Sequence, residues 1–295
     1  MERFTKMNEF VIFTDSSSDL PLPLAKEMGV CVLPLEVNME GTVKFNDEID
    51  VKEFYDYLRA KHDAKTSAIN MDRFIEAFEP VLASGKDLLY IGFSSGLSAT
   101  YMASKNAAEE LSQKYPERKI IAVDSLCASL GQGLMVKLAV DKKNAGATIE
   151  EVAEYVENER LHLAHWFTVD DLFFLHRGGR VSKMTAIAGT ALQFKPIMHV
   201  DNEGHLDKNT KPDKVRGRNA SITELFNQMK RSAVAPETQT VYICHGDCYD
   251  DAKKLADMIT AEWGITDILI GYTGPVIGAH SGPGTLAVFF LATER

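Results

Sequence analysis

Hydroxyl-bearing residues follow three apolar runs in the first half of the chain. They are Ser16 to Ser18, Ser94 with Ser95, and Ser125. Ligands of open α/β sheets bind at the carboxyl ends of strands, and hydroxyls together with turn N–H groups at a helix N-terminus suit an anion. The sequence has neither a G-x-G-x-x-G nor a Walker A pattern, so a dinucleotide or P-loop phosphate site is not predicted. The alternative is that these serines only cap helices.

A second interpretation of the same region is a hydrolase. The segment 92–96, Gly-Phe-Ser-Ser-Gly, fits the G-x-S-x-G nucleophile elbow between a strand and a helix. Ser94 would be the nucleophile of an esterase, with Asp171 or Asp247 as the acid and His280 as the base, which matches the chain order Ser, Asp, His. No HGGG-type oxyanion loop is visible, which argues against this interpretation. The serine hydrolase is therefore the alternative function and not the first choice.

The segment 244–248, Cys-His-Gly-Asp-Cys, carries two thiols and an imidazole that could ligate zinc. No second Cys or His pair has the spacing of a zinc finger, and a small Cys at the end of an apolar run is ordinary core. The sequence therefore predicts no metal site. Four cysteines in 295 residues are also too few for a disulfide framework.

Strands and helices alternate over the part of the chain that carries the hydroxyls. Strands are expected at 10–13, 30–37, 88–93 and 120–123, and helices at 51–58, 74–82 and up to residue 111. Asp50 is placed to cap the helix over 51–58, and Thr148 with Glu151 forms a capping box ahead of a further helix. This alternation predicts βαβ units and a parallel sheet in a first domain, residues 1–160.

The pattern changes beyond residue 160. Strands are expected at 165–169, 196–200, 241–246 and 267–272, a helix at 252–263, and a polar loop over 201–219. We predict a second, mixed α/β domain, residues 161–295. His162 and His165, three residues apart, are interpreted as solvated or satisfied side chains rather than ligands.

Composition excludes several classes of partner. Lys and Arg number 32 and Asp and Glu 42, a formal net charge of −10, which argues against nucleic acid and against docking on anionic membrane beyond a peripheral, transient contact. No apolar run is long enough to span a membrane and no secretory leader is visible, so a cytoplasmic protein is expected. One basic segment is interpreted either as a solvated loop or as a docking patch for an acidic or phosphate-bearing partner. Its cations are Lys208, Lys211, Lys214, Arg216 and Arg218.

Six segments resemble, in the same order, motifs of the DegV family. They are 13–21 (FTDSSSDLP), 65–67 (KTS), 94–101 (SSGLSATY), 177–181 (RGGRV), 195–197 (KPI) and 278–284 (GAHSGPG). Two departures from the family pattern concern the pocket mouth. Residues 68–70 lack the Pro and the second Ser of T-S-x-P-S, and Ala99 replaces a Gly.

The resemblance implies a two-domain α/β fold: an N-terminal three-layer α/β/α domain with a mainly parallel sheet, and a C-terminal mixed α/β domain. It also implies a long-chain fatty acid bound between the domains in a buried apolar tunnel, with no other cofactor. The protein would be no enzyme itself, and would present the acyl carboxylate to a separate fatty acid kinase for phosphorylation. A third possibility is an interaction protein whose lipid is only structural.

The resemblance also carries a carboxylate site onto this sequence. Its residues are Thr66, Ser94, Ser95 and His280, with Ser95 favoured over Ser94. Arg180 and Ser98 are secondary candidates.

Overall fold

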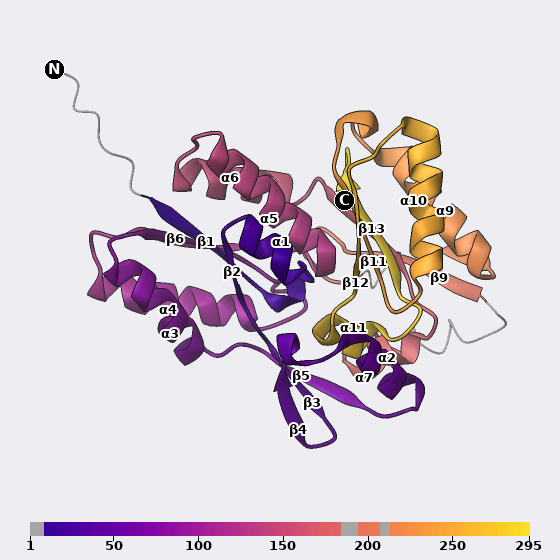
Figure 1. Cartoon of the computed structure of the whole chain (residues 1–295), viewed down its shortest axis with the longest axis horizontal. Coiled ribbons are helices and arrows are strands. Elements are labelled where there is room, and N and C mark those ends of the chain that lie inside the picture. The colour runs from indigo at the N-terminus through magenta and orange to yellow at the C-terminus, as the bar shows by residue number, and fades with distance from the viewer. Residues whose placement is uncertain (1–8, 184–193, 207–212) are drawn as a thin grey trace.

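The computed structural model describes residues 9–183, 194–206 and 213–295 (Figure 1). The strands are β1 (Phe10–Asp15), β2 (Val30–Leu33), β3 (Glu36–Met39), β4 (Thr42–Phe45), β5 (Ala64–Ser67), β6 (Asp87–Gly92), β7 (Ile120–Asp124), β8 (Leu163–Thr168), β9 (Phe194–His199), β10 (Asp213–Arg216), β11 (Val241–His245), β12 (Ile268–Tyr272) and β13 (Leu286–Leu291). The helices are α1 (Leu22–Glu27), α2 (Val51–Arg59), α3 (Met71–Ala83), α4 (Thr100–Lys114), α5 (Ser129–Asn144), α6 (Ile149–Glu159), α7 (Leu172–Arg177), α9 (Arg218–Ser232), α10 (Tyr249–Trp263) and α11 (Pro275–Ser281).

The first sheet is parallel and has the order β2-β1-β6-β7. Successive side chains of a strand point to opposite faces. Ile12 and Leu89 accordingly join the core under α1, α5 and α6, whereas Phe13 and Tyr90 join the core under α3 and α4. Figure 1 shows these two groups of helices on opposite faces of the sheet. The predicted three-layer α/β/α arrangement with a parallel sheet is confirmed.

The second sheet is mixed and has the order β10-β9-β8-β13-β11-β12, with only the β11–β12 pair parallel. Ile243 and Val288 pack on one face with α9 and α10, and Tyr242 and Phe289 lie on the other face in the core that contains α5. The predicted mixed α/β arrangement is confirmed. Helix α5 contacts strands of both large sheets, and the domain division at residue 160 stays a prediction.

A third, small antiparallel sheet, β4-β3-β5, was not expected from the sequence. It projects at the lower edge of the molecule in Figure 1, beside α2 and α11. Helix α11 packs against β3, β5, α2 and α7. This packing brings the segment around Thr66, on β5, next to the C-terminal part of the chain.

Local capping follows the expectations. The Asp50 carboxylate accepts from Glu53 N at 2.9 Å, and Thr148 and Glu151 exchange hydrogen bonds of 3.2 and 2.7 Å.

The predicted polar loop over 201–219 is wrong at its end, because β10 pairs with β9 and α9 begins at Arg218. No helix within the described ranges is long and apolar enough to cross a membrane.

Candidate functional site

A cavity of about 180 Å³ lies between the two large sheets, the small sheet and helix α11. Its wall draws apolar side chains from segments far apart in sequence, which include Leu35, Phe93, Leu97, Phe167, Leu175, Val200, Leu206, Val276, Ile277 and Phe289. Its polar wall residues include Thr66, Ser67, Ser98, Ser129, His165, Arg180, Thr273, His280, Ser281 and Thr285. A cavity that is mostly apolar with a few convergent polar groups is the usual form of a small-molecule site.

Helix α11 presents one face to this cavity. Pro275 occupies its first turn, where a missing N–H costs nothing. Backbone N–H groups at this end of the helix donate to side chains from the N-terminal part of the chain. Gly274 N donates to Asp19 at 3.0 Å, and Val276 N donates to Asn46 at 3.1 Å. The N-terminal part of the chain therefore sets the position of the helix that carries His280.

Thr66 and His280 meet in the cavity wall. The Thr66 Oγ1 atom lies 2.7 Å from His280 Nε2, a contact between residues 214 apart in sequence. Burial, and secondarily the charge of Arg180, lower the pKa of His280 to about 4, so the ring is neutral at pH 7. A neutral ring protonated on Nε2 donates to Thr66 Oγ1 and leaves the threonine O–H free to donate to a ligand.

The other ring nitrogen of His280 is covered by backbone. Nδ1 is buried without a hydrogen-bond partner in the described chain. A β-carbon placed on Gly178 would lie 2.1 Å from this atom. The G-G-R turn therefore supplies a glycine where the imidazole packs directly against the main chain.

Arg180 brings a positive charge to the same wall. Its guanidinium donates to the Leu97 carbonyl, at 3.2 Å from Nε and 2.8 Å from Nη2, and to the Gly178 carbonyl. No carboxylate pairs with it among the residues that the structure describes. Burial lowers the pKa of Arg180, but arginine stays charged at neutral pH. A part-buried cation without a counterion favours an anionic ligand.

The predicted serines divide between the cavity and its surroundings. Ser98 lies in the wall, and its Oγ is 2.9 Å from Thr100 Oγ1 at the start of α4. Ser94 and Ser95 do not line the cavity. The buried Ser94 hydroxyl donates to the Gly204 carbonyl at 2.7 Å, and Ser95 is exposed.

The geometry also bears on the hydrolase interpretation. Ser94 Oγ accepts from Gly96 N at 3.2 Å and donates to a main-chain carbonyl. Within the described ranges no histidine lies at hydrogen-bond distance from it, and His280 instead pairs with Thr66. Ser94 therefore lacks the base that activates a serine nucleophile.

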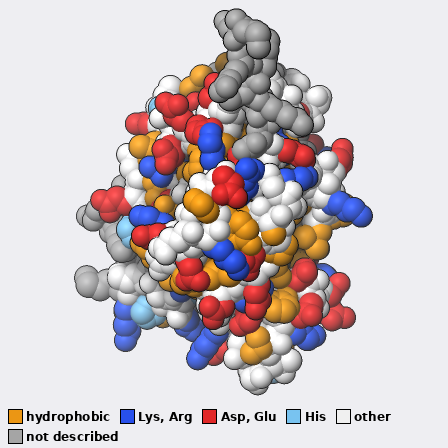
Figure 2. Space-filling model, turned by 90° about the vertical axis from the view of Figure 1, so that its left-hand side faces the viewer, with side chains coloured by type: hydrophobic (Ala, Val, Ile, Leu, Met, Phe, Trp, Pro, Cys, Tyr) orange, Lys and Arg blue, Asp and Glu red, His pale blue; other side chains and the backbone are white. Residues whose placement is uncertain are grey.

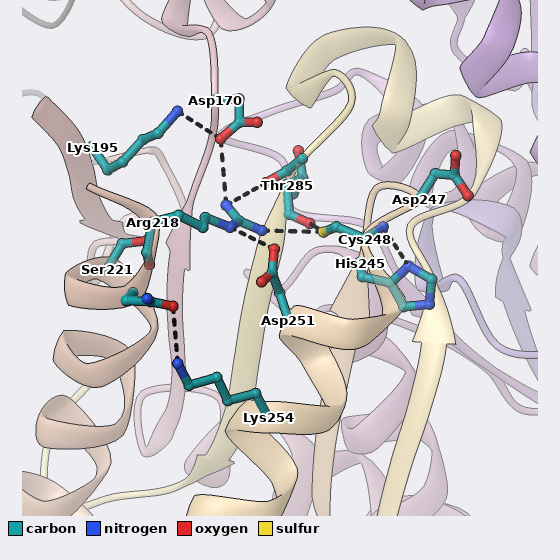
Figure 3. Close-up of polar contacts among 12 residues, drawn as sticks. Asp170, Lys195, Arg218, Ser221, His245, Asp247, Cys248, Asp251, Lys254 and Thr285 are labelled. Carbon is teal, nitrogen blue, oxygen red and sulfur yellow. Dashed lines mark hydrogen bonds and ion pairs between the residues drawn. The ribbon is translucent and has the colours of Figure 1, made fainter. Parts of the chain in front are cut away.

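The basic segment is described only in part. Lys208 and Lys211 lie outside the described residues, Lys214 belongs to β10, and Arg216 is exposed. The Arg218 side chain makes hydrogen bonds and ion pairs within the chain and is not a free cation for docking. Its guanidinium lies between the carboxylates of Asp251 and Asp170 (Figure 3), at 2.8 and 3.5 Å, and donates to the Gly284 carbonyl at 2.7 Å. The face drawn in Figure 2 intermixes acidic, basic and apolar side chains.

The segment 244–248, Cys-His-Gly-Asp-Cys, contacts the Arg218 guanidinium through Cys248. Arg218 Nη2 lies 3.1 Å from the sulfur of Cys248, and His245 Nδ1 accepts from Cys248 N at 3.3 Å (Figure 3). Burial raises the pKa of the Cys248 thiol to about 11. Across the described ranges, no group of three or more His, Cys, Asp or Glu side chains could hold a metal ion.

Six polar wall residues were not predicted as site residues: Ser67, Ser129, His165, Thr273, Ser281 and Thr285. His165 is buried and satisfied, since its Nδ1 pairs with the Leu163 carbonyl at 2.9 Å and its Nε2 accepts from Ala128 N at 3.4 Å. Ser281 follows His280 in the 278–284 motif. A helical spacing from Thr273 onward could have indicated it, but a seven-residue helix that contains Pro and Gly gives a weak sequence signal.

Comparison with known proteins gives a consistent result. The family described as "Uncharacterised protein, DegV family" matches residues 9–293. A DegV domain-containing protein of Clostridium perfringens is 44% identical over 292 residues, which are 98% of this chain and 99% of the relative. A fatty-acid-binding DegV family protein from Thermus thermophilus superposes with a TM-score of 0.84 at 28% identity, over 96% of this chain and 99% of that one.

A third relative shares the fold at lower identity. The Streptococcus pneumoniae fatty acid kinase (Fak) B3 protein, solved with linoleic acid, has a TM-score of 0.84 and 20% identity, over 96% of this chain and 99% of that one. At this identity the likeness concerns the fold alone.

Proposed function

This chain belongs to the DegV family, and on that premise we propose that its cavity binds a long-chain fatty acid. The carboxylate lies at the end of the cavity formed by Thr66, Arg180 and His280. The observation that carries the proposal is an apolar cavity whose wall holds a threonine–histidine pair and an arginine that lacks a carboxylate partner among the described residues.

The acyl chain supplies most of the affinity. Burial of a methylene contributes roughly 0.8 kcal/mol, so about 15 methylenes have a gross ~12 kcal/mol available. The loss of translation and the ordering of the chain reduce this sum substantially. Apolar side chains such as Leu97, Phe167 and Phe289 provide the surface against which the chain packs.

The polar wall positions the head group rather than reacting with it. Hydrogen bonds to a charged group contribute about 1.5–3 kcal/mol each. With the neutral His280 ring protonated on Nε2, this atom donates to Thr66 Oγ1, and the threonine hydroxyl then donates one such bond to the carboxylate. Arg180 uses three N–H groups on main-chain carbonyls and retains others for a ligand oxygen.

A carrier of this kind needs a second protein to activate its cargo. We infer that the partner is an ATP-using acyl kinase, which transfers the γ-phosphoryl group of ATP to a carboxylate oxygen and releases ADP. The resemblance to the DegV motifs supports this partner, and an ATP-using partner favours the cytoplasm. Of the basic docking segment, the exposed Arg216 remains a candidate contact.

Native mass spectrometry of the gently purified protein tests the proposal. We expect an adduct with the mass of a long-chain fatty acid, and rebinding of palmitate or oleate after delipidation. Absence of the adduct together with no binding of either acid contradicts the proposal. Labelling of Ser94 by a fluorophosphonate, with loss of ester turnover in Ser94→Ala, would instead support the hydrolase.

A further inference from the structure

We propose that Ser281 is a further ligand-binding residue, whose hydroxyl donates a hydrogen bond to the head group of the bound fatty acid. This inference rests on the proposed fatty-acid site and adds to it a residue on helix α11. Three features of the structure carry it: the position of Ser281 on the helix, the state of its hydroxyl, and the hydrogen-bonding capacity of a carboxylate.

Ser281 lies at the polar end of the α11 face that lines the cavity. The wall residues of α11 are Val276, Ile277, His280 and Ser281, and Thr273 lies in the wall just before the helix. Their spacing is that of one helical stripe. The middle of the stripe is apolar, whereas its C-terminal end carries His280 and Ser281. Ser281 therefore belongs to the same end of the cavity as the Thr66–His280 pair.

The hydroxyl of Ser281 is buried and unused. Ser281 is 5% exposed, and its Oγ has no hydrogen-bond partner in the described chain. A serine inside a helix commonly donates to the carbonyl four residues earlier, but Ser281 makes no such bond. A buried polar atom without a partner destabilises the lipid-free protein, which indicates a group that is satisfied when ligand is bound.

Other hydroxyls of the wall are already engaged. Thr285 donates to the Gly282 carbonyl at 2.7 Å, and Thr273 Oγ1 lies 3.1 Å from the Cys244 sulfur. Ser129 donates to Asp19, and Ser98 pairs with Thr100. Ser281 differs from these wall residues because its donor is free.

A carboxylate can use this donor. Its two oxygens offer about four acceptor positions, more than the one hydroxyl of Thr66 and the remaining two N–H groups of Arg180 fill. A hydroxyl bond to an ionised oxygen is stronger than one to a neutral group. The contribution of Ser281 to the binding free energy should thus be large for a fatty acid and small for a fatty alcohol with the same chain.

The test compares Ser281→Ala with the wild type in lipid-free, full-length protein. We expect the variant to bind palmitate about 10- to 100-fold more weakly, and to bind hexadecanol with a change of less than about threefold. We also expect the melting temperature without ligand to stay the same or rise, because an unsatisfied hydroxyl has been removed.

Ser221→Ala is the matched control. The Ser221 side chain is also buried, but its hydroxyl donates to the Arg218 carbonyl at 2.8 Å and does not line the cavity. This variant should melt at a lower temperature and bind palmitate like the wild type.

Several outcomes overturn the assignment of Ser281. They are an unchanged palmitate affinity, an equal loss for palmitate and hexadecanol, and a lower melting temperature of ligand-free Ser281→Ala. If the alanine variant does not fold, Ser281→Cys, which keeps the shape with a weaker donor, is judged by the same criteria. A wild type that binds no fatty acid refutes the proposed function instead.

Discussion

Substitution of Gly178 by alanine tests whether the main chain at this position sets the place of the His280 ring. Gly178 ends α7 with φ −71° and ψ −9°, a conformation that an alanine adopts without strain. The added β-carbon would nevertheless lie 2.1 Å from His280 Nδ1. The imidazole must then move, and its contact with Thr66 Oγ1, 2.7 Å in the structure, is lost.

The expected energy depends on the residue at position 280. With His280 present, overpacking of this kind costs roughly 1–3 kcal/mol. In a His280→Ala background the clash disappears, and Gly178→Ala should stabilise by about 0.4–1 kcal/mol because the unfolded chain loses freedom. The effect of Gly178→Ala should therefore change sign between the two backgrounds, and the double-mutant cycle should show a coupling of roughly 1.4–4 kcal/mol.

Urea unfolding of the lipid-free protein measures this coupling, and palmitate titration measures its effect on binding. Gly179→Ala is the matched control: Gly179 has φ +76° and open space around its Cα. That variant should destabilise by roughly 1–2 kcal/mol through backbone strain, equally in both backgrounds. If Gly178→Ala costs the same with and without His280, the contact that we describe does not position the ring.

Three further predictions concern the polar wall of the cavity. Because the folded pKa of His280 is lowered to about 4, the unfolded chain takes up a proton first on acidification. The stability that the neutral ring provides is therefore lost as the pH falls from about 6.5 to 4. NMR titration of the lipid-free protein should give a His280 midpoint near 4. A midpoint near 6.5 contradicts the burial argument. Thr66→Val keeps the shape and removes the donor, so palmitate should bind about 10-fold more weakly with hexadecanol little affected; equal losses for both ligands would indicate a packing effect. Arg180→Met removes the charge and should weaken palmitate more than hexadecanol by at least about 10-fold, measured by the same titrations; an unchanged ratio of the two affinities would show that the guanidinium does not act on the carboxylate.

Much of the fold was predictable because it follows from local patterns. The alternation of apolar runs and helical periods predicted the parallel sheet and its covering helices. The caps at Asp50 and Thr148 involve residues only three positions apart. Such features depend on backbone geometry that a short segment already contains.

The small sheet and helix α11 were not predictable in this way. Strands β3, β4 and β5 have four residues each, and α11 has seven residues that include Pro and Gly. Elements this short gain their stability from packing against other parts of the chain. The same elements carry Thr66 and His280, so the sequence pattern alone did not show how the two residues meet.

The class of fold, the ordered family motifs and a short set of polar residues that a head-group site could use can all be read along the chain. Which of these polar residues face the cavity depends on how distant segments pack. Ser94 and Ser98 lie in one turn, yet Ser94 donates to the carbonyl of Gly204 whereas Ser98 lines the cavity. The physical reason is that hydrogen-bond partners come from segments far apart in sequence, and the direction of each hydroxyl is set only when those segments pack.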